Sequence, residues 1–204
     1  MHVTTHLDGH PYDDLLLRKG QAGFPSFVVM DEDGELLAVV EDRSVDGFEH
    51  AVTQATEFAS TVRAAKEGKQ DARKEVFRKR VEWMALPLDQ AKAEFKALEL
   101  TDAERKALEV PLQMIEIYDA RLTADRAQGL AKLLRIHKEG RLLDDPRVTN
   151  TYWRYLAVGA EQLRDADAYA VYVEYLRGMV EKQPRMKASL EQAEKKLATL
   201  KTKD

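Results

Sequence analysis

The sequence predicts an α/β segment followed by a longer helical array, so that the protein is predominantly helical overall. Stretches rich in β-forming side chains end at Val40. Beyond Val62 the chain is rich in Ala, Leu, Glu, Lys and Arg, which are good helix formers. We therefore expect two domains, residues 1–66 and residues 67–204, with the sheet confined to the first.

The α/β segment is expected to contain a β-hairpin and a helix. Residues 26–30 and 35–40 fit two strands, and the Asp-Glu-Asp-Gly sequence at 31–34 is a strong turn signal between them. Ser44 is expected to cap a helix, because apolar residues then recur at helical spacing. Upstream, residues 1–7 fit a short strand and residues 12–19 a short helix.

The remaining chain is divided into helices by proline, glycine and capping signals. Thr101 and Glu104 form a capping box, and Asp145 followed by Pro146 fits an N-cap with proline in the first turn. Pro111 is expected to kink or split the helix that contains it. The expected helices are residues 69–85, 88–98, 102–119, 123–138, 146–163, 166–181 and 184–200.

Composition and charge exclude several classes of function. The 32 basic and 36 acidic residues give a net charge of −4 and are mixed along the chain, so nucleic acid is not an expected partner. No apolar run approaches the ~20 residues that span a bilayer, and no signal peptide is evident. As written, the chain is expected to be cytoplasmic; a periplasmic or secreted location would follow if the true N-terminus is missing.

Cysteine is absent from the sequence. This excludes disulfides, thiolate metal ligands and thiol nucleophiles in this chain. We found no other catalytic constellation and expect no cofactor.

The segment from Gly23 to Glu35 reads Gly-Phe-Pro-Ser-Phe-Val-Val-Met-Asp-Glu-Asp-Gly-Glu and resembles the thioredoxin-like superfamily around its conserved cis-proline loop. In that superfamily the loop precedes a strand, a turn with Asp and Gly, a second strand and a C-terminal helix. The resemblance covers roughly residues 2–65. It implies a loop that presents its backbone to an extended chain and is formed here by Gly23, Phe24, Pro25 and Ser26.

The resemblance is limited to the C-terminal half of that fold. The earlier strands and the Cys-x-x-Cys helix have no counterpart, and Met1 falls where the third strand of the family should begin. Either the chain is part of a longer reading frame, which the abrupt start favours, or the fold has decayed into a scaffold. Half a thioredoxin sheet would expose an unpaired strand edge, so we expect a homodimer through that edge or coverage by the helical tail.

Two functions from different classes follow. The leading hypothesis is a non-catalytic, thioredoxin-fold-derived binding or scaffold protein that engages protein or peptide segments. The alternative is a fragment of a thioredoxin-like thiol–disulfide oxidoreductase whose redox cysteines lie upstream of this start.

Large aromatic residues are concentrated between residues 152 and 176, in a segment that loosely resembles a tetratricopeptide-type helical hairpin. Such arrays often hold peptides in a concave groove. The groove candidates are Tyr152, Trp153, Tyr172 and Tyr175. Packing between two helices is the alternative role, and it is the one we favour for most of the aromatic residues in this segment.

Three histidines, His2, His6 and His10, recur every four residues and would share one face of a helix, as zinc or copper ligands can. Gly9 and Pro11 oppose a helix there. A polar strand end is therefore the favoured interpretation, and no metal site is expected.

Overall fold

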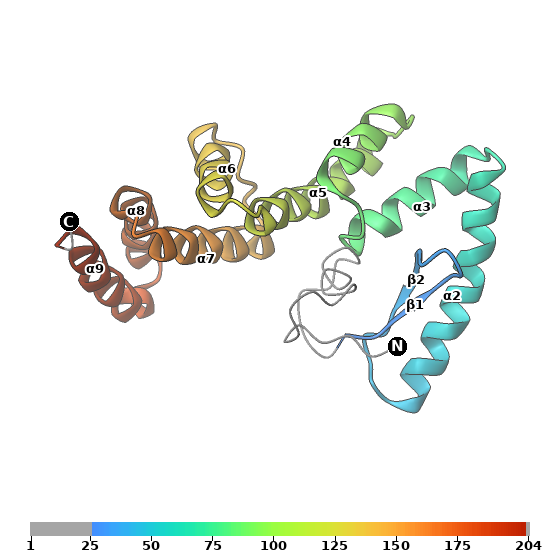
Figure 1. The fold of residues 1–204 in the computed structure, drawn as a ribbon, viewed down its shortest axis with the longest axis horizontal. Coiled ribbons are helices and arrows are strands. Elements are labelled where there is room, and N and C mark those ends of the chain that lie inside the picture. Colours follow the sequence, from blue (N-terminus) through green and yellow to red (C-terminus); the bar gives the residue numbers. More distant parts are fainter. Residues whose placement is uncertain (1–25, 203–204) are drawn as a thin grey trace. The chain divides into compact units, whose positions relative to one another are not determined.

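The structure is a computed structural model that describes residues 26–202. In that range the chain is predominantly helical, with a small two-stranded antiparallel sheet (Figure 1). It divides into two compact units, Met1–Ile115 and Glu116–Asp204, and the division falls inside helix α5. Among the described residues no helix is both long and apolar enough to cross a membrane.

The sheet is the hairpin of β1 (Val28–Met30) and β2 (Leu36–Val39), which confirms the two predicted strands. Val29 pairs with Ala38, and the register shifts at a bulge between Val29 and Met30. The side chain of Asp31 closes the turn by accepting a hydrogen bond of 2.7 Å from the Glu35 amide. Dimerisation through the hairpin edge stays a prediction.

Helix α2 (Val45–Lys66) begins as predicted at Ser44, whose hydroxyl accepts a hydrogen bond from the Gly47 amide at 3.1 Å. Asp42 in turn accepts hydrogen bonds from the Ser44 amide (2.9 Å) and hydroxyl (2.8 Å). A Cβ atom at Gly47 would lie 2.2 Å from the carbonyl oxygen of Asp42, so only glycine fits this cap. The connection from the hairpin therefore fixes where α2 starts.

The hairpin packs on α2 through a small apolar core. Its buried members are Leu37, Ala38 and Val40 from the hairpin segment, Ala51, Ala55, Phe58 and Val62 from α2, and Val76 from the next helix. Helices α3 (Gln70–Glu82) and α4 (Leu88–Ala97) complete the first unit together with the first part of α5. The predicted boundary between residues 66 and 67 falls inside this unit, because the ring of Trp83 after α3 packs edge-on against Phe58 at 5.2 Å.

The later helices follow the predicted segments closely. Helix α5 (Asp102–Leu122) runs through Pro111 without a break in the assigned helix, so the helix is not split there. Its capping box forms: Glu104 accepts a hydrogen bond of 2.6 Å from the Thr101 amide. The remaining elements are α6 (Arg126–Lys138), α7 (Pro146–Leu163), α8 (Ala166–Lys182), the 3-10 turn η1 (Pro184–Met186) and α9 (Lys187–Lys201).

In the second unit each helix packs on the next, α6 on α7, α7 on α8 and α8 on α9. Tyr152 is the largest fully buried side chain in the described residues. Its hydroxyl donates a hydrogen bond of 2.9 Å to the Leu133 carbonyl of α6, which removes the cost of burying a polar group. The finer likeness to tetratricopeptide repeats stays a prediction.

Gly129 sets how closely α6 approaches α5, because a Cβ there would lie 2.4 Å from the carbonyl oxygen of Ala120. We expect Gly129→Ala to lower the free energy of unfolding by about 1–3 kcal/mol, as overpacking does. The matched control is Gly178→Ala in α8, where a Cβ meets nothing within 4 Å. That substitution should raise stability by roughly 0.5–1 kcal/mol through helix propensity. Urea denaturation followed by circular dichroism measures the free energy of unfolding of both variants. An equal change in both would show that the close approach of α6 to α5 does not require glycine at position 129.

Burial raises the pKa of Tyr152 above its ordinary value of 10. In the unfolded chain this phenol ionises near pH 10, whereas in the folded chain it stays protonated. Its contribution to stability is therefore complete below pH 10 and is lost as the pH rises further. We expect Tyr152→Phe to cost about 1 kcal/mol at pH 8 and to lose stability less steeply than the wild type above pH 10. Urea denaturation at a series of pH values measures this, and parallel curves above pH 10 would contradict it.

Candidate functional site

Four large apolar side chains are exposed where the hairpin meets the start of α2. We call them the N-terminal apolar patch; their exposed fractions are 40% for Phe27, 74% for Val45, 38% for Phe48 and 55% for Val52. The rings of Phe27 and Phe48 meet edge to face at 5.3 Å, which joins the hairpin side of the patch to the helix side. Isolated exposed apolar residues are ordinary, but a contiguous group indicates an interaction surface.

The patch exists because the apolar face of α2 is wider than the area that the hairpin covers. The covered stripe contains Ala51, Ala55, Phe58 and Val62. Val45, Phe48 and Val52 follow one another at intervals of three and four residues, so they form a second stripe on the helix surface beside the first. Only the first stripe is fully packed inside the unit.

The residues around the patch are mostly acidic. Glu41, Asp42, Asp46 and Glu49 are exposed there, against Arg43 as the basic residue of the same stretch. Hydrogen bonds from the backbone and hydroxyl of Ser44 lower the pKa of Asp42 below its usual range, because they stabilise its charged form. The patch is therefore an apolar surface with a negative border.

Of the four predicted proline-loop residues, only Ser26 lies in the described part of the chain. It is half-buried and directly precedes Phe27 of the patch. Gly23, Phe24 and Pro25 lie outside the described residues, and so do His2, His6 and His10. Across residues 26–202 no three histidine, aspartate or glutamate side chains gather in a way that could hold a metal ion.

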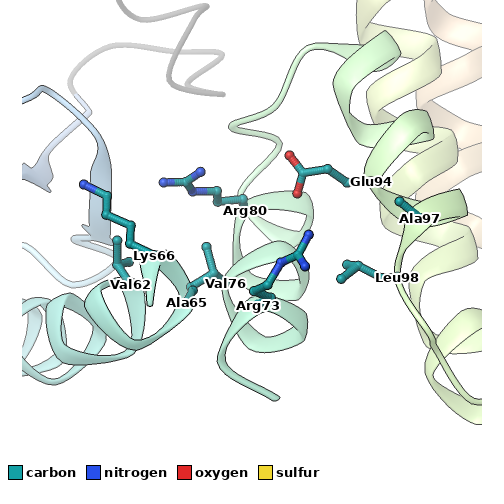
Figure 2. A pocket seen from close by; sticks show the side chains of 9 residues that line it. All are labelled: Val62, Ala65, Lys66, Arg73, Val76, Arg80, Glu94, Ala97 and Leu98. Carbon is teal, nitrogen blue, oxygen red and sulfur yellow. The ribbon is translucent and has the colours of Figure 1, made fainter. Parts of the chain in front are cut away.

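A second feature of the first unit is a cavity of about 230 Å³ between α2, α3 and α4, which we call the α2–α4 cavity. Its apolar wall is formed mainly by Val62 of α2, Val76 of α3 and Leu98 at the end of α4. Charged side chains from all three helices line the same cavity, and Figure 2 shows the charged ends of Lys66 and Arg80 directed away from those of Arg73 and Glu94.

Two of the three cations in the cavity are already paired. Arg80 contacts Glu35 of the hairpin at 3.1 Å, and Lys66 lies 3.8 Å from Asp33. Arg73 forms no ion pair with any residue that the structure describes. Arg80 keeps one buried donor, Nε, without a hydrogen-bond acceptor. Such an orphaned group calls for an explanation, and a bound water or ion is a common one.

The predicted aromatic groove residues come together as packing between α7 and α8. The rings of Trp153 and Tyr175 stack with centroids 4.2 Å apart, and Tyr172 lies 6.4 Å from Tyr175. Tyr152 and Trp153 are buried, with exposed fractions of 0% and 6%, so they are not accessible to a ligand on the surface. Tyr172 and Tyr175 are half-buried.

Sequence reasoning missed both the patch and the cavity, although each has a signal. The apolar positions of α2 occupy two neighbouring stripes rather than one, which indicates a surface that the rest of the unit does not fully cover. Arg73, Val76 and Arg80 follow helical spacing, so they share one face of α3. No pattern in the sequence indicates that α2 and α4 flank that face of α3.

The chain matches no known protein family, no curated protein and no solved structure.

Proposed function

We propose that this protein binds a segment of another protein, without catalysing a reaction, and that the N-terminal apolar patch is the contact surface. The exposure of Val45, Phe48 and Val52 on one stripe of α2, joined to Phe27, carries this proposal. Fully burying a valine side chain stabilises a complex by roughly 1.5–3 kcal/mol before the costs of association. Covering the patch therefore offsets part of the costs of association, and further contacts along the bound segment must supply the rest.

The border of the patch specifies the chemistry of the partner. Exposed Glu41, Asp42, Asp46 and Glu49 favour a segment that carries lysine or arginine beside its apolar side chains. These charges act at the rim and remain solvated, so they contribute more to the rate of encounter and to selectivity than to affinity. The partner is thus a basic segment with two or three large apolar residues.

The resemblance of residues 23–35 to the thioredoxin-like superfamily supports the same conclusion. In that superfamily the proline loop presents backbone groups to an extended chain. Here the corresponding residues, Gly23 to Ser26, immediately precede Phe27 in the sequence. Since the chain contains no cysteine, it supplies no thiol for exchange with a bound segment, which fits binding without catalysis.

The proposal is tested with peptides selected on the wild-type protein from a random peptide library. We expect selected peptides to combine aromatic or aliphatic residues with lysine or arginine, and their binding to weaken as salt rises. The Val45→Ser/Val52→Ser double variant should bind them at least tenfold more weakly, because two apolar contacts are lost. Fluorescence polarisation with labelled peptides measures the affinity.

The matched control is Val158→Ser/Leu163→Ser in α7, which removes two other exposed aliphatic side chains, with exposed fractions of 44% and 38%. It should bind the peptides as the wild type does. If no peptide is enriched, or if both double variants bind equally well, the patch is not the binding surface.

A further inference from the structure

The α2–α4 cavity is separate from the residues of the N-terminal apolar patch, and its chemistry is different. We propose that it binds a small zwitterion of the α-amino-acid type with a short aliphatic side chain. Its carboxylate would lie at Arg73, its ammonium group at Glu94, and its aliphatic part against Val62, Val76 and Leu98.

The charges that line the cavity point to a ligand that carries both signs. Arg80 and Lys66 already have ion-pair partners in Glu35 and Asp33, respectively. This leaves Arg73 as the cation of the cavity lining that has no ion-pair partner among residues 26–202. A simple anion would gain from Arg73 but would be repelled by the carboxylate of Glu94 on the opposite wall.

Glu94 supplies the complementary charge. Its side chain accepts a hydrogen bond of 2.8 Å from the amide of Gln90, and no cation lies within ion-pair distance of it in the described part of the chain. The carboxylate projects into the cavity from α4, while the guanidinium of Arg73 projects from α3 (Figure 2). A carboxylate accepts well from an ammonium group, and a guanidinium donates two parallel hydrogen bonds to a carboxylate. The two charges of an α-amino acid match this pair.

Size and the apolar wall restrict the ligand further. A cavity of about 230 Å³ is smaller than the roughly 300–1,000 Å³ of sites for drug-sized ligands, so it suits a molecule of few atoms. Val62, Val76 and Leu98 are buried side chains that line it. Contact with this wall stabilises a bound ligand that has an aliphatic side chain, whereas glycine has no side chain to make this contact.

The buried Nε of Arg80, a residue of the cavity lining, is a further polar group without a partner. This donor has no acceptor among the protein atoms, although the same guanidinium contacts Glu35 through Nη2 at 3.1 Å. Leaving a buried donor unpaired is unfavourable, and an oxygen atom at the edge of the cavity would satisfy it after a small side-chain movement. A carboxylate held by Arg73 brings two such oxygens into the space that Arg80 also lines.

The experiment is a ligand series titrated into the full chain, followed by two-dimensional amide NMR. L-leucine should give saturable shifts, in the millimolar range or tighter, at residues of α2, α3 and α4. N-acetyl-L-leucine lacks the ammonium group, L-leucinamide lacks the carboxylate and glycine lacks the aliphatic part. Each should bind at least tenfold more weakly, as expected for a lost charge-assisted hydrogen bond or several lost apolar contacts.

Two variants test the assigned residues. Arg73→Gln and Glu94→Gln should each weaken leucine binding at least tenfold, whereas Arg63→Gln and Glu57→Gln, which change exposed charges of α2 outside the cavity, should not. The ligand series requires no variant, so it decides the matter even if a substitution disturbs the fold. The proposal is overturned if leucine gives no saturable shifts, if the shifts lie elsewhere, or if N-acetyl-L-leucine binds as well as leucine.

Discussion

The packing of the hairpin on α2 is the interaction on which the rest of the first unit depends. Leu37, Ala38 and Val40 cover one stripe of the helix, and the cap formed by Ser44 and Gly47 fixes its starting point. Because α2 is longer than the hairpin is wide, the covered stripe ends before the apolar surface of the helix does. The N-terminal apolar patch lies beside the start of that stripe, and the α2–α4 cavity lies at its end, where Val62 belongs to both the core and the cavity wall.

Much of the local structure was predictable from the sequence because its signals are local. The turn at residues 31–34 specifies the hairpin, and the capping residues Ser44, Thr101 and Asp145 mark helix starts that the structure confirms. Pro111 gave a weaker signal: proline removes a backbone donor and its ring crowds the preceding turn, yet its neighbours in α5 continue the helix. Helix starts could therefore be predicted from capping residues that act within one turn. A break within a helix could not be predicted from proline alone.

The candidate sites were much less predictable, because they depend on which helix faces which. Tyr152 and Trp153 were candidates for a peptide-binding groove because they are aromatic. Large aromatic side chains gain most from complete burial, however, and both residues lie in the core. The patch and the cavity are instead formed largely by common residue types such as valine and arginine. Their role depends on where the fold places them. Arg73 and Arg80 share a face of α3 in any sequence-based reading, yet only the packing of α2 and α4 on either side turns that face into a cavity.

Apolar packing rather than ion pairing holds the cavity in shape. The pair between Arg80 and Glu35 joins α3 to the hairpin, but the glutamate side chain is 46% exposed, and such pairs contribute only about 0–1 kcal/mol. Edge-to-face contact between Phe58 and Trp83 contributes about 0.5–1.5 kcal/mol in addition to the area that both rings bury. With Val62 and Val76 buried in the same core, this packing fixes α3 against α2. Attraction between the charged groups of the cavity is therefore not needed to hold the helices in place. Arg73 and Glu94 can thus interact with a ligand without loss of the fold.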